Sequence, residues 1–228
     1  MAFLSFLALD YRWNWSSVLK YKSKFIQGWF YTLGLSCATL ILSLLIGVGA
    51  ALAKRSKVLL VRYLSTIYIE IIRGTPLLVQ IYFFFYVVAD AAGIQNRYIV
   101  GISIMSLFTG AYIAEIVRSG IESVSSSQLL SAKGIGLTPY QTYRHVIFPQ
   151  ALRRSLPALA GQFANLIKDS SLLSIIAISE FTLNAQEVNS FTYSSFESFF
   201  PLAFGYLALT LPIMRYARVL EKRIQFET

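Results

Sequence analysis

An uncharged run from Trp29 to Ala53 constrains this chain more than any other feature of its sequence. As a helix rising about 1.5 Å per residue, these 25 residues would extend about 37 Å, enough to cross a bilayer with some tilt. Hydrophobic residues make up 56% of the 228 positions and charged residues only 14%. A soluble domain of this size needs more charge on its surface. We therefore expect an all-α membrane protein.

Further apolar segments extend the expected membrane domain to about five transmembrane helices. They cover roughly residues 29–53, 64–89, 98–117, 156–178 and 199–217. The second segment is interrupted at Gly74-Thr75-Pro76, where glycine and proline predict a broken helix.

Small residues recur on one face of the first span. Ser36, Thr39, Ser43 and Gly47 fall at helical spacing, and side chains this small let a neighbouring helix approach closely. Cys37 lies in the same run, and a single cysteine excludes both an intramolecular disulfide and a cysteine cluster for a metal. We expect these residues to serve helix packing.

The basic residues predict the orientation in the membrane, because cytoplasmic segments carry the excess of Lys and Arg. With the C-terminus inside, the cytoplasmic residues would be Lys54, Arg55, Lys57, Arg62, Arg118, Lys133, Arg144, Arg153, Arg154, Arg215, Arg218, Lys222 and Arg223. The outer basic residues would be Arg12, Lys20, Lys22, Lys24 and Arg97, while the outer segment 179–198 contains three glutamates and no Lys or Arg. We predict N-out, C-in, and assign the net charge of +9 to topology rather than to nucleic-acid binding.

The same reasoning divides the chain into three parts. Residues 1–28 form an N-terminal periplasmic or interfacial segment, residues 29–217 a single transmembrane domain, and residues 218–228 a cytoplasmic tail. The longest hydrophilic segment, 118–155, is a cytoplasmic loop inside that domain. In it, Thr138 is placed to cap a helix with Pro139 at its first position, and this helix should run around 138–148 and end at Pro149. It could dock a partner or merely connect two spans.

Three stretches resemble a known family. The loop sequence SAKGIGLTPYQTYRHVIFPQALRRSLPAL (131–159) is similar to the cytoplasmic loop motif of ABC-importer permeases. RGTPLLVQ (73–80) and GAYIAEIVR (110–118) look like signatures of the polar amino-acid permeases, the histidine, glutamine and arginine type of binding-protein-dependent inner-membrane component. These matches follow the family's order from Trp29 to the C-terminus.

The resemblance implies a dimer with a second permease copy or a sister permease. It also implies docking to cytoplasmic ABC ATPase subunits and delivery of substrate by a periplasmic amino-acid-binding protein. The residues expected to couple to the ATPase are Ala132, Gly136, Leu137, Thr138, Pro139 and Pro149. Leu130 and Ser131 stand where the motif usually has Glu and Ala, which removes one polar anchor from the ATPase interface.

Ionisable residues inside the fourth expected span are candidates for the substrate pathway. Lys168 and Asp169 lie near its middle, where a charge is costly unless it is paired or faces water. Gln162, Asn165 and Lys168 recur every three residues and form a polar stripe that could line a cavity, with Lys168 binding a substrate carboxylate. The alternative is that Lys168 pairs with Asp169, or that an ion pair to another helix is formed, and that the pair fixes the packing.

Other polar residues near the membrane receive simpler interpretations. At the helix break, Thr75 and Pro76 are pathway candidates, because a broken helix frees backbone groups that could face a cavity. Glu70 is spaced to pair with Arg73, and Glu115 to pair with Arg118.

The sequence contains no phosphate-binding loop, HExxH or GxSxG motif, so we expect no enzymatic activity, metal or cofactor, and ATP hydrolysis on a partner subunit. We predict the permease subunit of an ABC importer in the bacterial inner membrane, surrounded by lipid, for a polar amino acid that is neutral or acidic rather than cationic. Two alternatives stay open: an ion-coupled secondary transporter that uses Lys168 and Asp169, and a noncatalytic membrane scaffold.

Overall fold

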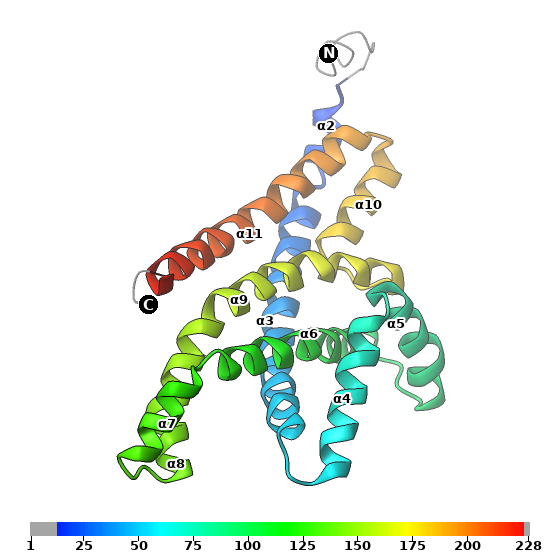
Figure 1. The fold of residues 1–228 in the computed structure, drawn as a ribbon. Helices are drawn as coiled ribbons and strands as arrows, with labels where there is room; N and C mark the ends of the chain where they lie inside the picture. The colour runs from blue at the N-terminus through cyan, green and yellow to red at the C-terminus, as the bar shows by residue number, and fades with distance from the viewer. Residues whose placement is uncertain (1–12, 226–228) are drawn as a thin grey trace.

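The computed structural model describes residues 13–225, and this part of the chain is helical without a β-strand (Figure 1). Residues 1–12, including Arg12 of the predicted N-terminal segment, and 226–228 of the predicted tail lie outside the described residues. The α-helices are α2 (Trp15–Leu19), α3 (Lys22–Lys54), α4 (Leu59–Gly74), α5 (Leu77–Phe83), α6 (Arg97–Glu122), α7 (Ser126–Gly134), α8 (Pro139–Thr142), α9 (Phe148–Asp169), α10 (Phe181–Thr192) and α11 (Ser195–Gln225). Two π-helical segments, η1 (Phe84–Ala89) and η2 (Tyr143–Ile147), and one 3-10 segment, η3 (Ser170–Ile176), join them.

Several helices are long and apolar enough to cross a membrane. Among the described residues these are α3, α6 and α11, and α4 with α5–η1 forms a fourth, broken candidate that bends by 109°. Helix α9, which covers the fourth expected span, is less apolar because it carries polar residues on one side. The prediction of an all-α membrane protein is confirmed, whereas five spans and the N-out, C-in orientation stay predictions.

Helices α3 and α6 pack along much of their length. The small residues Ser36, Thr39, Ser43 and Gly47 are all buried, as the sequence predicted for a packing face. A Cβ atom on Gly47 would lie 2.5 Å from Ile113 Cγ2, so only glycine permits this approach. Cys37, by contrast, is exposed and takes no part in this contact.

The loop helix begins as predicted but does not end where expected. Gln141 N donates to Thr138 Oγ1 at 3.3 Å and Thr138 N donates to Gln141 Oε1 at 2.8 Å, with Pro139 at the first helical position. The expected stop at Pro149 is wrong, because Pro149 lies in the first turn of α9, where a missing N–H is tolerated. The helical path therefore continues through η2 into α9, which begins before the expected boundary at 156 and gives way to η3 after Asp169.

Lys20, Lys22 and Lys24 are three basic residues close together on the side predicted to be outside, where few are expected, and the structure gives one of them a partner. Lys24 forms an ion pair with Glu187 on α10, and its ammonium lies 5.4 Å from the centre of the Phe191 ring. A glutamate of the segment 179–198 therefore neutralises one of the three lysines.

Glu180 links α10 to α11 at the same side of the fold. Its fully buried carboxylate accepts hydrogen bonds from the backbone N–H groups of Thr182 and Leu183 at 2.8 and 2.7 Å and from the Tyr206 hydroxyl at 2.9 Å. Burial raises the pKa of Glu180, although these hydrogen bonds oppose the shift. The residue caps α10 rather than facing solvent.

The glycine contact between α3 and α6 gives a direct stability test. We expect Gly47→Ala to lower the melting temperature in detergent, because the added methyl group overpacks against Ile113 at a cost of about 1–3 kcal/mol. Gly49→Ala is the matched control, since no atom lies within 4 Å of its Cβ position, and should leave the melting temperature unchanged or slightly higher. Equal melting temperatures for the two variants would show that this crossing does not limit stability.

Candidate functional site

The break between α4 and α5 is closed by one buried amide. Gln80 is 6% exposed, and its Nε2 donates to Ile72 O at 2.7 Å, to Thr75 O at 3.1 Å and to Thr75 Oγ1 at 2.8 Å. The carbonyls released by the break therefore have a partner within the chain, which is required at membrane depth. Thr75 and Pro76 themselves are exposed, so they stay available to a cavity or a second subunit.

Sequence reasoning did not single out Gln80. The signal was nonetheless present, because Gln80 closes the RGTPLLVQ stretch and stands five residues after Thr75. A buried glutamine one turn after a helix break supplies the hydrogen bonds that the broken backbone lacks.

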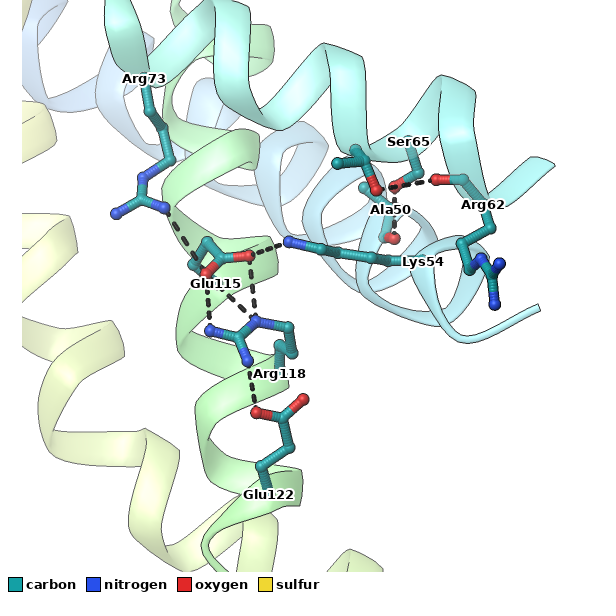
Figure 2. Close-up of polar contacts among 9 residues, drawn as sticks. Ala50, Lys54, Arg62, Ser65, Arg73, Glu115, Arg118 and Glu122 are labelled. Atoms are coloured by element: carbon teal, nitrogen blue, oxygen red, sulfur yellow. Dashed lines mark hydrogen bonds and ion pairs between the residues drawn. The ribbon is translucent and has the colours of Figure 1, made fainter. Parts of the chain in front are cut away.

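The carboxylate of Glu115 joins three helices (Figure 2). Lys54 Nζ on α3 lies 2.9 Å from Glu115 Oε1, Arg73 on α4 lies 3.5 Å from Oε2, and Arg118 on α6 lies 2.8 Å from Oε2. Arg118 also pairs with Glu122, one turn further along α6. The Glu115 side chain is only 17% exposed, so it holds these cations in a partly dehydrated setting.

This network corrects one predicted pair and confirms another. The Glu70–Arg73 pair is wrong: Arg73 turns to Glu115 and lies over the Tyr112 ring at 5.3 Å, while Glu70 is exposed. The Glu115–Arg118 pair is confirmed. Helical spacing alone could not select between these partners, because Glu115 stands 42 positions after Arg73 and reaches it only in the folded chain.

A polar cavity adjoins the Glu115 network. Its volume is about 520 Å³, and its lining includes Arg73, Glu115, Arg118, Arg154 and Gln162. The structure therefore brings Gln162, a predicted pathway residue on α9, to the same cavity as charged residues of α4 and α6. A cavity with both signs of charge suits a zwitterion, whose carboxylate and ammonium need opposite partners.

The other predicted pathway residues lie further along α9. Asn165 and Lys168 are exposed, and Asp169 is half-buried. Neither Lys168 nor Asp169 forms an ion pair within 4 Å with another residue of the described part of the chain. Segment η3 follows Asp169 and contacts α5, which places the end of α9 near the helix that follows Thr75 and Pro76.

Residues 126–147, comprising α7, α8 and η2, form a unit that we call the docking segment. Ala132 is 4% exposed, and its carbonyl accepts a hydrogen bond from Leu137 N at 3.0 Å. Gly136 has a φ of +82°, a conformation that favours glycine and turns the chain between α7 and α8. The large apolar side chains of Leu130, Ile135 and Tyr140 remain 69%, 78% and 68% exposed.

The predicted coupling residues thus share one unit, except that Pro149 lies beyond it, in the first turn of α9. A hydrogen bond of 2.9 Å from Gln150 Nε2 to Gln128 Oε1 ties α9 back to α7. The exposed apolar side chains of the docking segment are typical of a surface that a protein partner covers.

Residues 43–226 match the family described as binding-protein-dependent transport system inner membrane component. The chain belongs to this family. It is also 34% identical over 203 residues to the probable glutamine ABC transporter permease protein GlnM of Bacillus subtilis, covering 89% of this chain and 94% of that protein. The nopaline transport system permease protein NocM of Agrobacterium fabrum is 34% identical over 200 residues, covering 83% of each chain.

A solved structure agrees with these relatives. The crystal structure of an amino acid ABC transporter with histidines matches with a TM-score of 0.87 and 33% identity, covering 93% of this permease and 100% of that chain. The resemblance stated from the sequence motifs is confirmed. The protein is the permease component of an ABC importer, it works with a separate ATPase and a substrate-binding protein, and it is a component of the inner membrane.

The permease component is not itself an enzyme, since the ATPase is a separate subunit. Within residues 13–225, no group of three His, Cys, Asp or Glu side chains is arranged to hold a metal ion.

The Glu115 network can be tested by removing its carboxylate charge. We expect Glu115→Gln to lower the free energy of unfolding by about 1–3 kcal/mol, between the values typical of exposed and buried pairs, because three cations lose their shared partner. Glu122→Gln is the control, since Glu122 pairs with Arg118 alone and is 51% exposed. Thermal unfolding of both variants in the same detergent measures the difference, and equal losses would contradict a central role for Glu115.

Proposed function

We propose that this permease imports a polar amino acid by alternating access, as one half of a dimeric membrane channel. The relatives are named for glutamine and nopaline transport, and the matched structure is an amino acid transporter. The observation that carries the proposal is the exposed polar face of α9. Asn165 and Lys168 lie there on a helix of the membrane domain without a hydrogen-bond or ion-pair partner among the described residues.

Placing the charged side chain of a lysine in contact with lipid is energetically costly, because the charge loses its hydration. The face of α9 that carries Lys168 must therefore meet water or another protein. A second permease placed against this face would enclose a polar pathway between the two subunits. Whether that subunit is an identical copy or a sister chain does not alter this argument.

Lys168 supplies a cation for the carboxylate that all amino acids share, and Asn165 and Gln162 supply amide groups for the remaining polar atoms. Asp169 and the exposed Thr75 and Pro76 complete the proposed pathway. In the adjoining cavity, the cations Arg73, Arg118 and Arg154 outnumber the single carboxylate of Glu115. This balance supports a neutral or acidic substrate over a cationic one.

The second part of the proposal concerns the ATPase: the docking segment inserts into that subunit. Its exposed Ile135 and Tyr140 would be covered by that subunit, and the turn at Gly136 presents them. Leu130 is also exposed, so the position that usually carries a glutamate here offers an apolar contact instead. The helical path from α8 through η2 into α9 would transmit ATPase closure directly to the helix that carries Lys168.

The proposed substrate pathway predicts a transport defect without loss of fold. We expect Lys168→Ala to reduce ATP-dependent amino-acid uptake into proteoliposomes at least tenfold, because the substrate carboxylate loses its cation. Lys168→Arg should restore part of the rate. The control is Lys57→Ala, an exposed lysine between α3 and α4 that should leave uptake unchanged. Normal uptake by Lys168→Ala would remove Lys168 from the substrate pathway, and uptake by the wild type that continues without ATP would contradict ATP-driven alternating access.

The docking segment predicts a separate defect. We expect Gly136→Asp combined with Leu137→Asp to abolish copurification with the cognate ATPase, since the turn and an apolar contact are both lost. Gly93→Asp is the matched control, because Gly93 also has a positive φ, of 67°, and lies in the loop between η1 and α6. Retained copurification of the double variant would remove the docking segment from the interface.

A further inference from the structure

An apolar groove lies between α3, α6 and the beginning of α9. The C-terminal end of α3 and the beginning of α9 lie at the same end of the molecule as α7 and α8 (Figure 1). The volume of the groove is about 410 Å³. The lining includes Leu44, Val48 and Leu52 on α3, Ile121 on α6, and Phe148 and Leu152 on α9. The groove is separate from the polar cavity beside Glu115, although both use α6 and α9.

The groove opens toward the lipid-facing side of α3. Val48 and Leu52 line it and are still 40% and 50% exposed, and their neighbours Ile41 and Leu45 are 62% and 68% exposed. Unlike the face of α9 that carries Lys168, this exposed face of α3 is uniformly apolar, which suits the hydrocarbon of the bilayer. Water has few polar partners in such a groove, so a hydrocarbon chain is the favoured occupant.

Arg55, at the C-terminal end of α3, follows the apolar stripe that lines the groove. Leu44, Val48 and Leu52 are spaced four residues apart and form a stripe about 12 Å long, which Arg55 continues on the same face at the end of α3. Lys54 is held by Glu115 at 2.9 Å, whereas the Arg55 guanidinium has no hydrogen-bond or ion-pair partner among residues 13–225. Arg55 is therefore free to meet a negative group at the membrane surface.

The groove also faces away from the surface proposed for the second permease. At 3.6 residues per turn, Lys168 lies about 160° around α9 from Leu152. A second permease that covers Lys168 would leave the groove open to lipid.

We propose that the groove binds one acyl chain of an anionic phospholipid, whose phosphate contacts Arg55. The chain lies along Leu44, Val48 and Leu52 and reaches Phe148, the first residue of α9. The docking segment ends immediately before Phe148, so the bound lipid supports the angle between α3 and the docking segment. This inference requires membrane insertion but does not depend on the transported substrate.

Native mass spectrometry of the full-length chain, purified with an equimolar mixture of phosphatidylglycerol and phosphatidylcholine, tests the groove. We expect one retained phosphatidylglycerol per chain. Val48→Trp fills the groove and should reduce the retained fraction at least fivefold. Leu45→Trp, the control on the neighbouring exposed position of α3, should stay within twofold of the wild type. If Val48→Trp aggregates, Leu152→Trp fills the groove from α9 instead.

The headgroup contact is tested separately. Arg55→Gln should reduce the preference for phosphatidylglycerol over phosphatidylcholine at least threefold, while Lys57→Gln, two residues away and also exposed, should leave it unchanged. Wild-type retention in Val48→Trp would overturn the groove as the site. Equal retention of both lipids by the wild type would overturn the headgroup contact. Loss of the lipid on assembly with the ATPase or a second permease would assign the groove to a protein partner.

Discussion

Gly47 and Gly110 let the backbones of α3 and α6 approach closely where the two helices cross. Within a bilayer the hydrophobic effect contributes little to such helix association, because lipid tails are as apolar as the side chains. A Cβ atom on Gly110 would lie 2.9 Å from Ile46 Cγ2, and one on Gly47 would meet Ile113 at 2.5 Å. In lipid, helices associate through close packing and polar contacts, so small residues at the crossing supply the contact area. Helices α4 and α9 each pack against both members of this pair.

Helix α6 then connects this contact to both functional regions. Its Glu115 holds Lys54 of α3 and Arg73 of α4, next to the polar cavity. Two turns further along, where α6 ends, the Arg154 guanidinium of α9 donates to the carbonyl of Ser123, directly before the docking segment. Helices α6 and α9 therefore link the docking segment to the polar cavity by direct contacts.

Part of the site could be predicted from local patterns. Thr138 and Pro139 gave the start of the loop helix, because a capping residue and a proline act on the nearest few peptide groups. The polar stripe could also be predicted locally, because the period of the α-helix places Gln162, Asn165 and Lys168 on one face. Pro149 was misread, since a proline ends a helix from inside but is compatible with the first turn of the next one, and the choice depends on the surrounding fold.

The sequence by itself determined the class of protein, the face of α3 that packs, the break after Gly74 and the family, because each depends on apolar length, helical period or a contiguous motif. Only the tertiary structure decided the partners of the charged and polar groups. Arg73 forms an ion pair with Glu115 rather than with the nearby Glu70. Gln80 donates hydrogen bonds to the carbonyl groups at the helix break. Such pairings join residues on different helices or across a bend of 109°, and their distances are set by helix packing rather than by spacing along the chain.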